Sequence, residues 1–177
     1  MFDLNQNQPP GWMRFARTRQ VEWREVQAMA RRHEHDIRDR YDLLVAIMRA
    51  GSPVAALLSR QTGLPIDYVV CSRRNPDPFF LDGPARAPRA RRILLVDDVS
   101  GTGWTFRRCK RYCEMLGNEV GTFSVFRCDA PGMYVPDFSM AADPDEYLRW
   151  PWEYQQEPEM PQFSVDRGAG ARLLATA

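Results

Sequence analysis

Four segments rich in apolar residues constrain the fold of this chain more than any other feature of its sequence. Each has the length of one strand, and they lie at 42–48, 64–71, 92–98 and 120–128. An apolar run without alternation is typical of a strand that is covered on both faces, as in a parallel sheet. A shorter fifth strand is expected within 132–141.

Segments with helical spacing separate these strands. They lie at about 21–38, at 54–63, where Gly63 ends the helix, and at 106–116. Strands that alternate with helices predict an α/β fold, in which a mostly parallel five-stranded sheet is flanked by helices. Ligands of such folds bind at the carboxyl ends of the strands.

The length of 177 residues suits a single domain. We expect this domain to cover 12–157, with a small C-terminal hood mainly in 127–157. The segments 1–11 and 158–177 are expected to be loose arms.

Composition narrows the range of functions. The net charge is +1, so nucleic acid is not expected as a partner. The chain shows no signal peptide and no stretch of membrane-spanning length, which favours a cytoplasmic protein without a membrane partner. Lys110 is the only lysine, so arginine must fill almost every cationic role. The four cysteines form no CxxC pair and are interpreted as buried, reduced thiols.

The segment ILLVDDVSGTGWT, residues 93–105, carries the strongest functional signal. An apolar strand ends in Asp97 and Asp98, and a small, hydroxyl-rich loop follows at once. The loop is not a Walker motif, because it has no lysine. It is not a dinucleotide fingerprint either, because Phe106 stands where a third glycine is needed.

A ribose 5-phosphate satisfies both halves of this segment. Backbone N–H groups and hydroxyls at a helix N-terminus suit a phosphate monoester, and glycines permit close approach of the backbone. The two carboxylates can accept hydrogen bonds from sugar hydroxyls or face Mg²⁺. The competing interpretation is a solvated Asp-Asp turn before a glycine-rich helix start. The coincidence of strand, acid pair and loop favours the sugar phosphate.

The same segment resembles the PRPP-binding motif of the type I phosphoribosyltransferases. The segment LLVAIMRAGSPVAALLSRQTGLPI, residues 43–66, is similar to their first strand, pyrophosphate loop and following helix. The resemblance covers about residues 20–153. It implies an enzyme with five parallel core strands, a flexible loop over the site, a hood that binds the base, and Mg²⁺ as cofactor.

The resemblance implies a role for each residue of these motifs. Asp97 and Asp98 would bind the ribose 2′- and 3′-hydroxyls, and would bind Mg²⁺ directly or through water. The residues that would hold the 5-phosphate are Ser100, Gly101, Thr102, Gly103, Trp104 and Thr105. The pyrophosphate loop, which in the family often carries a strained peptide bond, would consist of Arg49, Ala50 and Gly51.

The Arg- and Pro-rich segment 72–91 matches the mobile catalytic loop of the family. Its arginines would reach over the pyrophosphate and exclude water. They are Arg73, Arg74, Arg86 and Arg89. The alternative for any one of them is a place on a basic surface loop. The residues expected to take part in catalysis are Asp97, Asp98, Arg49, Arg73 and Arg74.

The segments SVFRC and YLRWPWE resemble the purine branch of the family, closest to its hypoxanthine/xanthine-guanine members. Arg127 would replace the lysine that reads the exocyclic oxygen, Tyr147 would stack on the base, and the Leu148 backbone would read the base edge. The residues expected to build the hood are Trp150, Trp152 and Glu153. One position departs from the pattern: Gly101 stands where 6-oxopurine enzymes carry an aspartate that takes the N7 proton.

Two functions remain open. The first is a transferase that moves the 5-phosphoribosyl group from PRPP to a purine-like base, with a nucleoside monophosphate as product. The second is a non-catalytic PRPP- or nucleotide-binding regulator of the same fold, which Gly101 favours. The resemblance also allows a homodimer.

Overall fold

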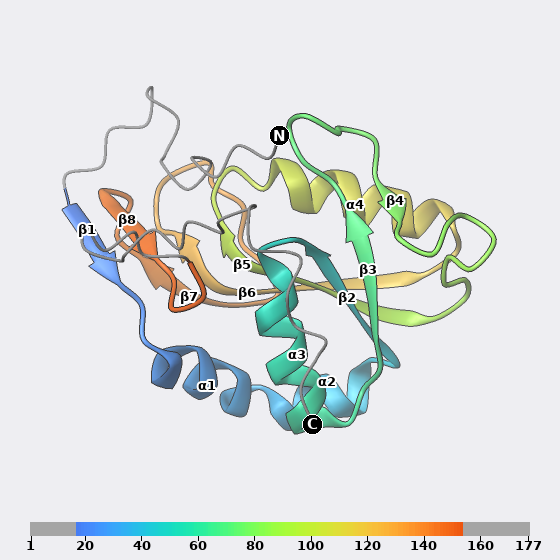
Figure 1. Ribbon diagram of the computed structural model, residues 1–177, viewed down its shortest axis with the longest axis horizontal. Coiled ribbons are helices and arrows are strands. Elements are labelled where there is room, and N and C mark those ends of the chain that lie inside the picture. The colour runs from blue at the N-terminus through green and yellow to red at the C-terminus, as the bar shows by residue number, and fades with distance from the viewer. Residues whose placement is uncertain (1–16, 154–177) are drawn as a thin grey trace, which may run out of the picture.

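The structure is a computed structural model, and it describes residues 17–153 (Figure 1). The predicted arms at 1–11 and 158–177 lie outside the described residues, as do both ends of the predicted domain. The elements are β1 Arg17–Gln20, α1 Trp23–Arg32, α2 Glu34–Arg40, β2 Leu43–Met48, α3 Gly51–Thr62, β3 Ile66–Val70, β4 Phe79–Phe80, β5 Arg92–Ser100, α4 Trp104–Met115, β6 Glu119–Cys128, β7 Phe138–Ala142 and β8 Glu146–Arg149.

A six-stranded sheet forms the centre of the molecule, in the order β4-β3-β2-β5-β6-β7. The pairs from β3 to β7 are all parallel, and only β4 pairs antiparallel, with β3. The predicted α/β fold with five parallel strands is therefore confirmed. The expectation that 72–91 is loop throughout was incomplete, because Phe79 and Phe80 form β4 and the Phe80 ring is buried.

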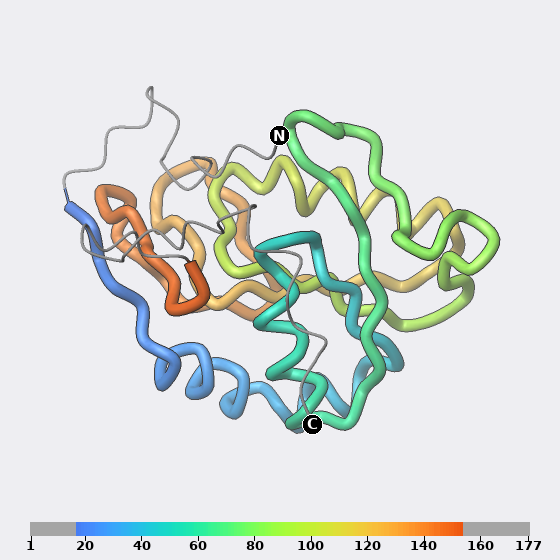
Figure 2. Tube along the Cα trace, in the orientation of Figure 1, coloured from blue at the N-terminus to red at the C-terminus, as the bar shows by residue number. Residues whose placement is uncertain are grey.

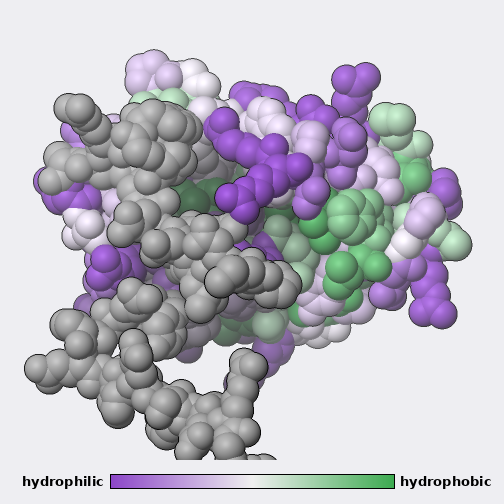
Figure 3. All heavy atoms as spheres, turned by 45° about the horizontal axis from the view of Figure 1, so that its top comes forward, coloured by the Kyte–Doolittle hydropathy of each residue, from purple (hydrophilic) through white to green (hydrophobic). Residues whose placement is uncertain are grey.

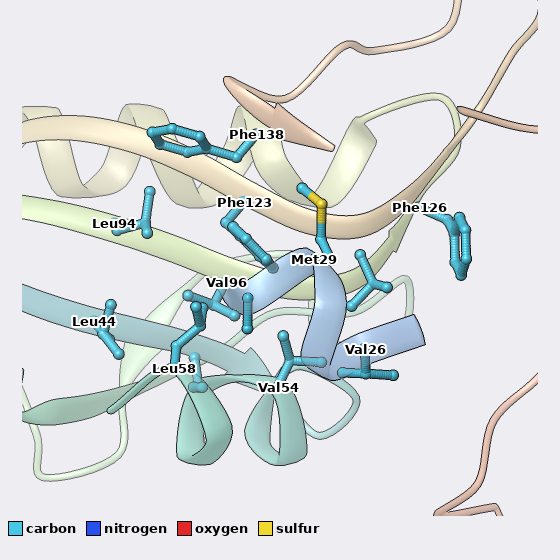
Figure 4. Close-up of a cluster of buried hydrophobic side chains, with 14 of the residues drawn as sticks. Val26, Met29, Leu44, Val54, Leu58, Leu94, Val96, Phe123, Phe126 and Phe138 are labelled. Atoms are coloured by element: carbon cyan, nitrogen blue, oxygen red, sulfur yellow. The ribbon is translucent and has the colours of Figure 1, made fainter. Parts of the chain in front are cut away.

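Helices cover both faces of the sheet, as the apolar runs predicted. In β2, Leu44 and Ala46 pack under α1, α2 and α3, while Val45 and Ile47 lie in a second cluster with α4. Figure 4 shows the first cluster, with Met29, Val54 and Leu58 directed at the sheet. A strand that buries every side chain has no polar face, which explains the absence of alternation in its sequence.

The helix expected at 21–38 is two helices. His33, between α1 and α2, has φ −113° and ψ 7°, and its ring lies 5.0 Å from the Phe138 ring, centroid to centroid. The break lets Ile37 of α2 reach the same core as Met29 of α1. Gly63 ends α3 as predicted, with φ 76°.

A second, two-stranded sheet was not expected from the sequence. Strand β1 pairs in parallel with β8, so that Thr18 lies opposite Tyr147 (Figure 2). The predicted hood therefore includes a segment from the other end of the chain. No short pattern marks β1, because RTRQ has neither an apolar run nor alternation.

On the face that Figure 3 shows, the visible described residues are largely hydrophilic, with hydrophobic groups gathered on the side of the molecule where β4 lies. Phe79 and Leu81 are among the exposed large hydrophobic residues. Within residues 17–153, no helix is long and apolar enough to cross a bilayer.

Candidate functional site

The acid pair lies where β5 emerges from the centre of the sheet. Strand β5 is hydrogen-bonded to β2 on one side and to β6 on the other, so its carboxyl end lies between those of two neighbours. The Asp98 N–H donates to Asp97 Oδ1 (3.0 Å), and the Val99 N–H donates to Asp98 Oδ1 (2.7 Å). Asp98 is only 7% exposed. The burial of Asp98 within β5 argues against the solvated Asp-Asp turn, while Asp97 is half-buried.

Burial makes the charge of this pair costly. It raises the pKa of Asp98 to about 6, and the nearby Glu153 carboxylate adds to the shift. Burial and the negative charge of Asp98 raise the pKa of Asp97 well above its usual value. A positive ion at the pair would reverse both effects.

The donor set fits Mg²⁺. Carboxylate oxygens are hard ligands, and Mg²⁺ usually binds through one or two carboxylates while it keeps waters or substrate phosphates. Among the described residues, no group of three or more His, Cys, Asp or Glu side chains could hold a metal ion by itself. Asp97 and Asp98 can therefore hold this ion only together with oxygens from water or ligand.

The predicted phosphate loop leads directly into the start of α4. Gly103, with φ 73°, immediately precedes the helix, so the free N–H groups of its first turn face the loop. A cavity of about 160 Å³ lies here. Its lining includes Asp97, every residue from Val99 to Phe106, and Arg73 of the β3–β4 loop. The sequence prediction placed all but Val99 and Phe106 at this site.

Ser100 contributes differently from the other hydroxyl residues of the loop. It is 1% exposed, and its hydroxyl donates to the Tyr134 carbonyl oxygen (3.3 Å). A hydroxyl has one proton, so Ser100 cannot donate to a phosphate while this bond exists. The exposed or half-buried Thr102 and Thr105 remain as hydroxyl donors.

The predicted pyrophosphate loop lies beside the acid pair. Gly51 begins α3, and a Cβ at this position would overlap the Val96 carbonyl oxygen and come within 3.2 Å of Asp97 Cα. Only glycine permits so close an approach. The Met48–Arg49 peptide bond is cis. Arg49 and Ala50 are exposed, and the Arg49 guanidinium makes no hydrogen bond or ion pair with another described residue.

The β3–β4 loop brings one of its arginines to the site. Arg73 lines the cavity, whereas Arg74, Arg86 and Arg89 are exposed and lie outside its lining. The loop is held to α4 by Arg108, which donates to the Pro76 carbonyl oxygen (2.5 Å). Of the predicted loop arginines, the structure therefore brings Arg73 together with the phosphate loop.

Arg127 lies directly beside the phosphate loop. It pairs with Ser100 in the β5–β6 ladder, a relation that the sequence alone could not reveal. Its guanidinium forms an ion pair with Asp129 at 3.3 Å, while Nη1 is buried without a hydrogen-bond partner among the described residues. A buried donor without a partner is costly, and an acceptor on a ligand would satisfy it.

Strand β8 carries the other two predicted base contacts. Arg17 N–H donates to Asp145 O and Val21 N–H to Arg149 O, so alternate residues of β8 face β1. In a parallel pair this alternation turns the N–H and C=O of Leu148 away from β1. The Leu148 side chain is buried, and Tyr147 is half-buried.

The charges of Glu153 and Asp98 both raise the pKa of Tyr147, after the larger effect of burial. Tyr147 thus lies within electrostatic range of the acid pair. Glu153 was expected only to build the hood. Its Oε2 accepts from the Trp150 N–H (3.1 Å), and Trp150 stacks on Trp152 with 4.9 Å between ring centroids. These contacts support the expected structural role, but the influence of Glu153 on Asp98 was missed.

Comparison with known proteins agrees with this geometry. The family model for the phosphoribosyl transferase domain matches residues 18–142. A curated hypoxanthine/guanine phosphoribosyltransferase of Methanosarcina mazei is 30% identical, with 45% of this chain and 48% of that protein covered. The chain thus spans about half the length of the curated relative that it matches.

Two crystal structures share the fold. The purine phosphoribosyltransferase from Pyrococcus horikoshii has a TM-score of 0.66 at 22% identity, with 81% of this chain and 99% of that chain covered. A Neisseria gonorrhoeae protein with bound ppGpp has a TM-score of 0.64 at 18% identity, with 81% and 93% covered.

Proposed function

Because the chain belongs to the phosphoribosyltransferase family, we propose that it transfers the 5-phosphoribosyl group of PRPP to a purine-like base and releases pyrophosphate. The observation that carries the proposal is the cavity that joins Asp97, the phosphate loop and Arg73. The Asp97 carboxylate for ribose hydroxyls, N–H groups for a phosphate and a cation for a leaving group are thereby present in one site, and the buried Asp98 lies next to it.

The protein's contribution to this reaction is position and charge. Asp97 and Asp98 accept hydrogen bonds from the ribose hydroxyls, and the start of α4 holds the 5-phosphate. The bond from C1 to pyrophosphate breaks through an oxocarbenium-like state, and its electron pair leaves on the pyrophosphate oxygen. A base nitrogen forms the new bond to C1, and the proton that the base gives up passes to water. Arg73 and Arg49 offset the negative charge on the leaving pyrophosphate. Mg²⁺, bound at Asp97 and Asp98, would supply further positive charge for the pyrophosphate oxygens.

The base is proposed to bind between Arg127 and β8. The Arg127 guanidinium presents paired N–H donors, which match two adjacent acceptors on the edge of a 6-oxopurine. Leu148 N–H and C=O are turned to the edge of β8 that pairs with no other described strand, where they can pair with the base. Tyr147 supplies a ring from the same strand.

The test is calorimetric titration with Mg²⁺-PRPP, followed by assay of pyrophosphate release with adenine, hypoxanthine, guanine, xanthine and orotate. We expect binding, and turnover with at least one purine. Absence of PRPP binding would refute the ligand assignment. Turnover with orotate alone would refute the assignment of the base.

A second candidate is a non-catalytic regulator that binds PRPP or a nucleotide. Gly101 favours it, because this position has no carboxylate for a base proton, and the similar Neisseria gonorrhoeae protein has ppGpp bound. Binding of Mg²⁺-PRPP without turnover on any base would support this candidate over the transferase. A homodimer remains a prediction, which light scattering of the purified protein can check.

A further inference from the structure

A residue from a distant part of the chain packs against the phosphate loop. The segment 129–137 connects β6 to β7, and Tyr134 of this segment binds the loop at two backbone positions. Its N–H donates to the Gly101 carbonyl oxygen (3.1 Å). Its carbonyl oxygen accepts the hydroxyl of Ser100 (3.3 Å). Two successive loop residues are thereby tied to one residue more than thirty positions away.

The Tyr134 ring packs against the other end of the loop. A Cβ added to Gly103 would overlap Tyr134 Cβ and Cγ, so the ring base rests directly on the Gly103 backbone. On its flank the ring stacks on Phe106, with 5.6 Å between centroids and 16° between planes. The Arg107 guanidinium lies 5.3 Å from the ring centroid, and it also donates to the Thr102 carbonyl oxygen.

We infer that Tyr134 is a positioning residue that holds the phosphate loop in the shape that binds a 5-phosphate. It does not line the cavity, so it acts through the loop rather than on the ligand. The inference rests on the proposed function for the identity of the ligand. Nothing in the sequence motif that predicted the site includes this residue.

The physical reason lies in how the loop must bind an anion. Its donors are backbone N–H groups, and an oxyanion binds them strongly only if they converge before it arrives. Glycines at 101 and 103 let the backbone adopt this shape but give it little resistance to change. Tyr134 restrains the loop backbone, because its ring fills the space into which Gly103 would otherwise move.

The experiment compares two ligands on four proteins. Ribose 5-phosphate reports on the phosphate loop, and Mg²⁺-pyrophosphate reports on the opposite, Arg49 side of the site. The proteins are the wild type, Tyr134→Ala, Tyr134→Phe and Val135→Ala. Val135 is 66% exposed on the same segment, which makes its substitution a matched control. Thermal unfolding of each protein shows whether the fold is retained.

We expect Tyr134→Ala to weaken ribose 5-phosphate binding by about 10-fold or more and to change pyrophosphate binding by less than about 2-fold, because a small misplacement of donors is costly. Tyr134→Phe keeps the ring and should bind both ligands like the wild type, as should Val135→Ala. In turnover with PRPP, the Tyr134→Ala loss should appear mainly in KM.

Three results would overturn the inference. Equal losses for both ligands would show a general structural role, and a Tyr134→Phe variant as weak as Tyr134→Ala would show that the ring is not responsible. A Tyr134→Ala variant with the ribose 5-phosphate affinity of the wild type would also overturn the inference. If the wild type binds ribose 5-phosphate but turns over no base, only the transferase activity fails. If the wild type binds neither ligand, the proposed function and the inference fail together.

Discussion

Asp97 and Asp98 illustrate at the scale of single residues how this site is prepared for its ligand. The strand buries the Asp98 carboxyl group and half-buries that of Asp97, and the negative charge of Asp98 raises the pKa of Asp97. Ribose hydroxyls and a divalent cation are the groups that relieve this unfavourable state, because they donate hydrogen bonds or positive charge.

Removal of both charges should abolish substrate binding without loss of the fold. We expect Asp97→Asn with Asp98→Asn to lower Mg²⁺-PRPP affinity by about 100-fold or more, since a single charge contact can be worth about 10²–10³ in rate. Calorimetry measures the affinity, and circular dichroism checks the fold. Retained PRPP affinity in a folded double variant would refute the ribose assignment.

Stability of the metal-free protein should depend on pH through Asp98. Its pKa rises from 3.8 to about 6 on folding. Between these values the folded chain keeps a proton that the unfolded chain has released, so the free energy of unfolding falls as pH rises from about 4 to about 6. The loss is on the order of 2–3 kcal/mol, at ~1.36 kcal/mol per pKa unit.

Urea unfolding at several pH values, with a chelator present, measures how the free energy of unfolding depends on pH. Asp98→Asn should make the dependence on pH weaker without removing it, because the amide does not titrate while Asp97, whose pKa is also raised, still does. Asp82→Asn, at an exposed position between β4 and β5, is the control that should keep the dependence on pH. A slope that is the same in Asp98→Asn and the wild type would contradict the assignment of the titrating group.

Arg127 should govern the choice of base more than the affinity for PRPP. Its Nη1 is buried without a hydrogen-bond partner in residues 17–153, and the residue lies beside the phosphate loop through the β5–β6 ladder. We expect Arg127→Ala to lower kcat/KM for a 6-oxopurine by about 10-fold or more, while the KM for PRPP changes by less than about 3-fold. Equal losses for both substrates in steady-state kinetics would exclude the base-reading role.

At the scale of elements, the site depends on how closely α3 approaches β5. Gly51 is the first residue of α3, and its Cα lies against the Val96–Asp97 backbone. The contact sets the distance between the pyrophosphate loop and the acid pair. The helix and the strand are joined by buried side chains such as Val54, Leu58 and Leu94, so neither can shift alone.

A single methyl group at Gly51 should therefore separate the two halves of the site. We expect Gly51→Ala to weaken Mg²⁺-pyrophosphate binding by about 10-fold or more, because the added Cβ overlaps backbone atoms that cannot move aside. Ala56→Gly, on an exposed position of the same helix, tests whether helix stability alone is responsible. A Gly51→Ala variant with normal pyrophosphate affinity would disprove the proposed spacing.

At the scale of the whole molecule, the hood joins two distant parts of the chain. Strand β1 lies beside β8, and ion pairs of Arg17 with Asp143 and Glu146 hold them together. The Arg19 guanidinium covers the Phe126 ring at 4.8 Å. The proposed base site on β8 therefore depends on a segment that precedes the first helix.

Loss of the β1–β8 pairing should affect the base and spare the phosphate. Arg19 lies between Arg17 and Val21, which both donate to β8, so its N–H also faces β8. Arg19→Pro removes this donor, whereas Arg19→Ala removes only the side chain. We expect Arg19→Pro to bind the purine about 10-fold more weakly than Arg19→Ala does, a difference of ~1.4 kcal/mol, with unchanged affinity for ribose 5-phosphate. Calorimetry measures the affinity for both ligands. An equal loss of affinity for the purine and for ribose 5-phosphate would argue against a separate hood.

Sequence alone determined the features that are local. The strand positions follow from apolar runs, because burial on both faces leaves no other pattern, and the acid pair with its phosphate loop is contiguous from 93 to 105. Gly63 ended a helix as predicted, since a left-handed residue closes helices. Each of these inferences depends only on residues that are close together in the sequence.

Tertiary structure alone decided which distant residues meet. Tyr134 against Gly103, Arg127 beside Ser100, and β1 beside β8 are contacts across 30 or more positions or between neighbouring strands, and no local periodicity encodes them. The β1–β8 pair in particular depends on where the chain returns after the sheet is complete. The loop proposed to bind the phosphate could therefore be predicted from the sequence, while the residues that pack against it and the strand proposed to bind the base could not.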